Sequence, residues 1–121
     1  MSKTIMIVDD SVSIRKVVAL TLKSSGYTVL EAEDGQAALE LLDGRKIHLI
    51  ICDVNMPRMD GLTFARSARE KDQYRFVPII MLTTESGEEK KEEGMEAGVR
   101  AWMTKPFQPQ QMMTAVSRLI T

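Results

Sequence analysis

LIICDVNMPRMDG, residues 49–61, is the stretch of the sequence that decides the fold. Its first four residues are apolar, and the run stops at Asp53, which a loop containing Pro57 follows. A short apolar run bounded by turn signals is typical of a strand that is buried on both faces. An acid at the end of such a strand lies at the carboxyl edge of an open α/β sheet, where these sheets bind ligands. The stretch therefore predicts a parallel sheet with a functional acid at its edge.

Strand-like and helix-like segments alternate five times along the chain. We expect strands over residues 4–8, 28–32, 49–52, 77–82 and 101–104, with helices from Ser11 or Ser13 and over 34–43, 62–69, 87–97 and 108–120. Apolar spacing predicts an inward face on the first helix, made of Ile14, Val17, Val18, Thr21 and Leu22. Asp60 is expected to cap the third helix. This alternation favours an α/β, doubly wound fold with helices on both faces of a parallel sheet.

Composition narrows the function classes. The 121 residues suit one domain, which we expect to span residues 1–121. The net charge of −1 gives no bulk attraction to nucleic acid or to an anionic membrane. No apolar run reaches the roughly 18 residues of a membrane span, and the first residues do not look like a signal peptide. With one cysteine, Cys52, which we expect to be a buried apolar filler, the sequence predicts a cytoplasmic protein.

Polar side chains gather at the carboxyl ends of the expected strands. These are Asp9, Asp10, Glu33, Asp53, Thr83 and Lys105. Carboxylates brought close together repel one another, so a cation is needed to hold them. Carboxylate oxygens suit Mg²⁺, which keeps waters that a phosphate can replace. Because a carboxylate held by a metal and a lysine can attack phosphorus, the pattern predicts phosphoryl transfer onto Asp53.

Four motifs carry a resemblance to a known family. They are Val8-Asp9-Asp10, the stretch from Asp53 to Gly61, Met81-Leu82-Thr83-Thr84 and Lys105-Pro106-Phe107, each at a strand end. With these motifs, the whole chain is similar to a response-regulator receiver domain. The resemblance implies a flavodoxin-like (βα)5 fold with strand order 2-1-3-4-5. It also implies a phosphoacceptor of a two-component system that catalyses only its own phosphorylation and dephosphorylation, and not an enzyme acting on other substrates.

The resemblance implies a role for each matching residue. Asp53 matches the phosphoacceptor, and Lys105 and Thr83 match the amine and the hydroxyl that engage the phosphoryl group. Asp9, Asp10 and Asp53, with the backbone carbonyl of Asn55, match the residues of the Mg²⁺ site. Pro106 matches a proline that is usually cis, and Trp102 falls at the aromatic switch position.

Two positions depart from the family pattern, and one pair is expected to modulate the site. The switch residue is usually Tyr or Phe where this chain has Trp102, and Thr84 stands where Ala is common. Asn55 and Glu85 match the pair that flanks the site in chemotaxis (CheY-type) regulators, where the pair favours short-lived phosphorylation.

Within the family, the chain looks most like these chemotaxis regulators. The resemblance implies a histidine kinase of the chemotaxis type as phosphodonor, a flagellar motor switch protein or another protein as target, and a phosphatase. A phosphate sink or a phosphorelay intermediate is the alternative. A remote alternative is an aspartate-nucleophile phosphatase of the haloacid dehalogenase type, which usually has a second acid where this chain has Asn55.

Overall fold

The structure is a computed structural model that describes residues 2–83 and 88–120, with side chains except for 88–91. Along the chain lie β1 Thr4–Val8, α1 Val12–Ser24, β2 Thr28–Ala32, α2 Gly35–Leu41, β3 Leu49–Asp53, α3 Gly61–Glu70, the 3₁₀ turn η1 Asp72–Tyr74, β4 Ile79–Thr83, α4 Glu88–Glu96, β5 Val99–Thr104 and α5 Pro109–Leu119. The strands form one parallel sheet in the order β2-β1-β3-β4-β5. The expected fold class and strand order are confirmed.

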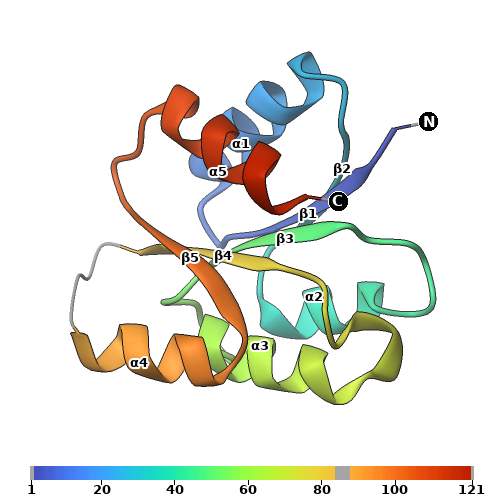
Figure 1. Cartoon of the computed structure of the whole chain (residues 1–121), viewed down its shortest axis with the longest axis vertical. Helices are drawn as coiled ribbons and strands as arrows, with labels where there is room; N and C mark the ends of the chain where they lie inside the picture. Colours follow the sequence, from blue (N-terminus) through green and yellow to red (C-terminus); the bar gives the residue numbers. More distant parts are fainter. Residues whose placement is uncertain (1, 84–87, 121) are drawn as a thin grey trace.

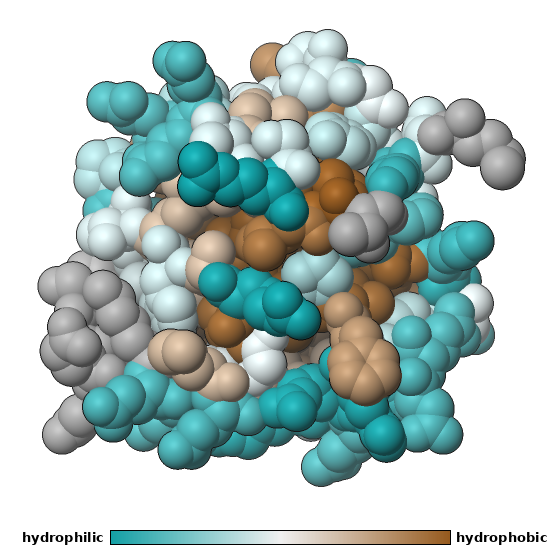
Figure 2. Space-filling model, in the orientation of Figure 1, coloured by the Kyte–Doolittle hydropathy of each residue, from teal (hydrophilic) through white to brown (hydrophobic). Residues whose placement is uncertain are grey.

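Helices cover both faces of the sheet. In Figure 1, α1 and α5 lie on one side of it and α2, α3 and α4 on the other. Every residue of β3 and β4 is buried. Ile50 and Cys52 of β3 join the apolar cluster under α2 and α3, while Leu49 and Ile51 join the cluster under α1 and α5. Figure 2 shows apolar side chains in the middle of the molecule, between the two helical layers.

Polar residues start three of the helices, as the sequence pattern indicates. The side chains of Ser11, Asp34 and Asp60 accept hydrogen bonds from the backbone N–H three residues on, at 3.3, 2.8 and 2.8 Å. Each cap satisfies an N–H that has no partner within its helix. The caps of α1 and α3 fix where these helices leave the carboxyl edge of the sheet.

The structure differs from the sequence-based expectation in four places, apart from shifts of one residue at the ends of elements. Helix α2 ends at Leu41 rather than at residue 43. Val17 is 52% exposed, so its assignment to the inward face of α1 is wrong. The inward face is made by Val18, Ala19 and Leu22, and Val17 lies at the side of this narrow apolar stripe. Strand β4 begins at Ile79 rather than at residue 77. Strand β5 begins at Val99 rather than at 101, and the β4–β5 register shifts beside this extra length.

No helix within the described residues is long and apolar enough to cross a lipid bilayer.

The burial of Cys52 gives a first prediction. The side chain is fully buried in β3, and this burial, with the charge of Asp53 beside it, raises the pKa of the thiol. Because the thiolate is the reactive form, Cys52 in the native protein should not react with Ellman's reagent at pH 8. We expect full labelling in denaturing urea, and native labelling only at the rate of unfolding. Rapid labelling of the native protein would contradict the buried position.

Candidate functional site

Three acidic residues meet at the carboxyl edge of the sheet. Asp9 follows β1 and Asp53 ends β3, and these strands pair with Val8 opposite Cys52. Carboxylate oxygens of Asp9, Asp10 and Asp53 all lie within 4.8 Å of one another. Asp9 is 1% and Asp53 6% exposed, while Asp10 faces solvent. Burial of like charges at this distance is unfavourable unless a cation compensates them.

Lys105 supplies part of this compensation. Its Nζ lies 2.9 Å from Asp9 Oδ2 and 3.3 Å from Asp53 Oδ2, and its side chain is largely buried. The backbone N–H of Lys105 donates to the carbonyl of Thr83 at 2.8 Å, which ties the end of β5 to the end of β4. The peptide bond from Lys105 to Pro106 is cis. One ammonium against three carboxylates leaves two negative charges for a bound cation to neutralise.

Burial and charge act in opposite directions on the two central groups. Burial raises the pKa of Asp53 above its usual range, although Lys105 lowers it, and the charge of Asp9 adds to the rise. Burial alone would lower the pKa of Lys105, but the hydrogen bond and charge of Asp9, together with Asp53, raise it. Lys105 therefore stays protonated, while the ionised form of Asp53 is less stable in the fold than in water.

The loop after Asp53 fits closely around that residue. The backbone N–H of Asn55 donates to the Asp53 carboxylate, and the Asn55 side chain is exposed. Gly61 begins α3 directly under the end of β3, and its N–H donates to the Val54 carbonyl at 2.8 Å. A Cβ at Gly61 would overlap the Asp53 carbonyl, so only glycine permits this approach. The sequence shows Gly61 as a helix start but gives no sign of this contact.

Of the predicted residues Thr83, Thr84 and Glu85, the structure describes only Thr83. Thr83 ends β4, is 2% exposed and lies one residue beyond Leu82, which pairs with Asp53. The predicted positions of Thr84 and Glu85 lie outside the described residues.

Trp102 lies in β5, opposite Met81 of β4, and its ring packs against α4 at Gly94. The ring occupies space that exists because residue 94 is glycine: a Cβ there would overlap the six-membered ring of the indole. The Trp102 Nε1 is buried and has no hydrogen-bond partner among the described residues. A buried N–H without a partner costs about 1–3 kcal/mol, so packing alone holds the ring in this position. Gly94 was not found from the sequence, because the contact joins two separate elements.

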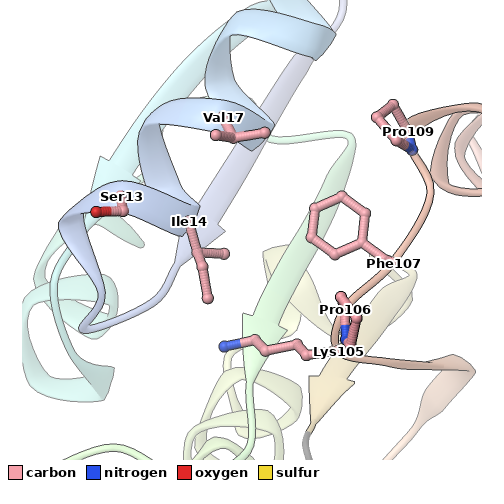
Figure 3. Close-up of a pocket in the computed structure, with 7 residues that line it drawn as sticks. All are labelled: Ser13, Ile14, Val17, Lys105, Pro106, Phe107 and Pro109. Carbon is pink, nitrogen blue, oxygen red and sulfur yellow. The ribbon is translucent and has the colours of Figure 1, made fainter.

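An apolar groove of about 550 Å³ opens beside the acids, between α1 and the segment that follows β5. Figure 3 shows Ile14 and Val17 on α1 facing Phe107 across this groove, with Lys105 at one end. Its other lining residues are Ser13, Pro106 and Pro109. The groove thus runs from an exposed apolar surface to Lys105, whose ammonium pairs with Asp53.

Residues 5–117 match the model of the response regulator receiver domain. The chain belongs to this family. Its members are the regulatory phosphoacceptor domains of two-component systems, so the general function predicted from the four motifs is confirmed.

Relatives of two kinds share the domain. The chain is 41% identical over 108 residues to chemotaxis protein CheY1 of Helicobacter pylori, covering 88% of this chain and 87% of that protein. It is 37% identical over 118 residues to the phosphate regulon transcriptional regulatory protein PhoB of Pseudomonas aeruginosa, covering 98% of this chain. The chain spans about half the length of that regulator, 52%. The receiver is therefore shared between lone chemotaxis regulators and longer transcription regulators.

Solved structures show the same fold. Chemotaxis protein CheY4 of Vibrio cholerae superposes with a TM-score of 0.95 and 42% identity, covering 99% of this chain and 100% of that chain. A receiver domain of a sensor histidine kinase of Pseudomonas aeruginosa superposes with a TM-score of 0.89 and 28% identity, over 98% of each chain. That structure holds a magnesium ion in its active-site cleft.

The acidic cluster fits a magnesium ion by its chemistry. Its ligands are oxygens, two of the three acids are buried, and Asp10 faces solvent, where waters complete a coordination shell. Mg²⁺ in proteins is usually held by one or two carboxylates and several waters. Asp10 and Asp53 would hold the ion directly, and Asp9 is already bonded to Lys105.

The raised pKa of Asp53 predicts an effect on stability. Because folding raises this pKa, the ionised carboxylate destabilises the fold at neutral pH, and stability returns as pH falls through the folded pKa. Asp53→Asn keeps the shape and removes the charge, so without divalent cations it should raise Tm by a few degrees. Added Mg²⁺ should then stabilise the wild type more than the variant. Asp72→Asn, in the exposed pair with Arg75, is the control. It should change neither the Tm without divalent cations nor the stabilisation that Mg²⁺ gives. A lower Tm for Asp53→Asn would contradict the repulsion.

The Gly94 contact predicts where the indole ring lies. Gly94→Ala should force the Trp102 ring away from α4, with emission shifted to longer wavelength and easier quenching by acrylamide. Met95→Ala removes an exposed side chain from the same turn. It should leave the emission wavelength and the quenching by acrylamide unchanged. Unaltered emission in a folded Gly94→Ala protein would show that the ring does not depend on this space.

Proposed function

We propose that this receiver takes a phosphoryl group from a histidine kinase onto Asp53, with Mg²⁺, and thereby changes its protein-binding face around Trp102. The observation that carries the proposal is the position of Lys105, whose ammonium joins Asp9 to Asp53 at the edge of the sheet. This arrangement leaves negative charge for a cation and places a positive charge where phosphoryl oxygens arrive.

The reaction is a displacement at phosphorus. A carboxylate oxygen of Asp53 attacks the phosphorus of a phosphohistidine, the P–N bond breaks, and its electron pair returns to the imidazole nitrogen. Lys105, 3.3 Å from Asp53, can transfer a hydrogen bond to an incoming phosphoryl oxygen while keeping its bond to Asp9. When bound, Mg²⁺ supplies neutralising charge for the phosphoryl oxygens. The Thr83 hydroxyl, at the next strand end, is our candidate for the group that reports the new oxygens to the rest of the fold.

The test uses the purified protein, Mg²⁺ and acetyl phosphate as a small donor. We expect one added phosphoryl group by mass spectrometry, released by hydroxylamine as an acyl phosphate should be, and no addition to Asp53→Asn. Phosphorylation that survives Asp53→Asn would place the acceptor elsewhere. Steady turnover of small phosphomonoesters would instead favour the haloacid dehalogenase type of phosphatase.

The output we propose is protein binding in chemotaxis. Support comes from the similarity to CheY1 and CheY4, both chemotaxis proteins, over most of their length. On this proposal residues 1–121 act as a single receiver domain, and the flagellar motor switch is the first candidate target. A phosphate sink or phosphorelay intermediate would share the site but would not bind motor proteins more tightly when phosphorylated, so a binding measurement separates these outputs.

The groove beside the acids suits a protein donor. A phosphohistidine must bring its phosphorus to Asp53, so the chain that carries it has to lie on the adjoining surface. We propose that this surface is the groove between α1 and Phe107, which ends at Lys105. Its apolar lining suits the exposed apolar stripe of a helical kinase domain.

Val17→Asp should separate protein donors from small ones. A charge on the half-exposed rim of the groove should slow phosphotransfer from a cognate kinase about tenfold or more, equivalent to about 1.4 kcal/mol. The rate with acetyl phosphate should stay unchanged, because Val17 does not touch the acids. Phe76→Asp is the control: Phe76 is 82% exposed and precedes β4, at the opposite edge of the sheet. If the kinase phosphorylates the wild type and Val17→Asp at equal rates, the groove is not part of the docking surface.

A further inference from the structure

Arg15 lies on α1, but its guanidinium reaches the end of the sheet. Its Nη1 donates to the backbone carbonyl of Asp9 at 2.8 Å, and its Nε donates to Glu31 Oε1 on β2 at 3.1 Å. The two side chains are 14% and 23% exposed. A planar guanidinium bonded in two directions to different elements has little freedom to move. Arg15 is therefore a fixed connection between α1, β2 and the loop that carries the acids.

This bond completes the set of bonds around Asp9. The Asp9 N–H donates to the Ala32 carbonyl at 3.1 Å, and its Oδ1 accepts from the Ser11 N–H at 2.8 Å. Its Oδ2 accepts from Lys105 at 2.9 Å. With Arg15 on the carbonyl oxygen, every polar atom of this buried residue has a partner. Asp9 is thus held in place by the protein's own groups.

The situation of Asp10 is the opposite. Asp10 is exposed, and among the side chains that the structure describes, those of residues 2–83 and 92–120, none forms a hydrogen bond or ion pair with it. The direction in which this side chain leaves the chain, along its Cα–Cβ bond, is set by the backbone at Asp9 and Asp10. The Asp9 carbonyl belongs to the peptide that joins Asp9 to Asp10, so the bond from Arg15 fixes the plane of that peptide. Orientation of a metal ligand by bonds one step removed from the ion is a general feature of metal sites.

We propose that Arg15, held by Glu31, is a positioning residue for the cation site: it orients the Asp9–Asp10 peptide so that Asp10 and Asp53 face one ion. The proposal rests on the function proposed above, because it concerns the same divalent cation. It adds an interaction between α1 and β2 to the residues that determine cation affinity.

Charge and position predict opposite effects when Arg15 is replaced. Arg15 is a cation near a cation site, so if only its charge mattered, Arg15→Met would strengthen binding of a divalent ion. If Arg15 positions Asp10, the same variant should weaken binding, although a repulsive charge has gone. The sign of the change therefore distinguishes the two explanations.

The experiment titrates the full chain with Mn²⁺, follows free Mn²⁺ by electron paramagnetic resonance, and competes the bound ion with Mg²⁺. We expect Arg15→Met to raise the Kd of both ions roughly tenfold. Arg15→Lys should recover part of the loss, because an ammonium can bond the Asp9 carbonyl but has no fork to hold Glu31 as well. Lys16→Met is the matched control. Lys16 also pairs with Glu31, at 3.4 Å, but does not touch the acidic loop. The Kd of the Lys16→Met protein for both ions should therefore stay within twofold of the wild-type value.

Thermal unfolding of each variant, without metal, separates affinity from stability. Weaker binding by Arg15→Met than by Lys16→Met, at temperatures where both are folded, supports the positioning role. Unchanged or tighter binding by a folded Arg15→Met protein overturns it. Should the Arg15→Met protein fail to fold, Arg15→Lys decides in the same way. Absence of Mn²⁺ binding by the wild type would instead contradict the proposed function itself.

Discussion

The ion pair of Lys105 with Asp9 and Asp53 is the interaction on which the site depends. Parallel strand order brings β1 and β3 side by side, so their terminal acids must meet, and the core below keeps water away from two of them. One ammonium offsets part of that repulsion. The charge that remains is the physical reason why the site suits a cation, and why phosphoryl oxygens need both the cation and Lys105 beside Asp53.

The residues around this ion pair differ in how firmly they are held. Asp9 has a partner at each polar atom, and Gly61 lets α3 press against the end of β3. Trp102, by contrast, is held against α4 by packing alone, with its N–H buried and no partner among the described residues. The ring lies three residues before Lys105 on β5, and the Lys105 N–H bonds the end of β4. This closeness along β5 supports the proposal that phosphorylation at Asp53 changes the face around Trp102.

Local patterns in the sequence were sufficient for the alternation of strands and helices and for the list of acids, whereas the strand order came from the resemblance to the receiver family. Continuous apolar runs marked β3 and β4, helix caps marked Ser11 and Asp60, and the strand ends then placed Asp9, Asp53 and Lys105 at one edge. Contacts between separate elements were not predictable: the bonds of Arg15 and the close approach of Gly94 to Trp102 leave no local signal. Val17 was misplaced because helical spacing defines a stripe but not its width, and only the packed α5 and β1 show where that stripe ends.

Fluorescence of Trp102 tests the central claim most directly, because the chain contains one tryptophan and it lies on the strand that ends at the site. The titration adds Mg²⁺ and then beryllofluoride, a mimic of the phosphoryl group, to wild type and to Asp53→Asn. We predict a saturable response to Mg²⁺ and a further change with beryllofluoride that Asp53→Asn abolishes. No response to Mg²⁺ together with no beryllofluoride effect, in a folded protein, would contradict a cation-dependent phosphoacceptor coupled to Trp102.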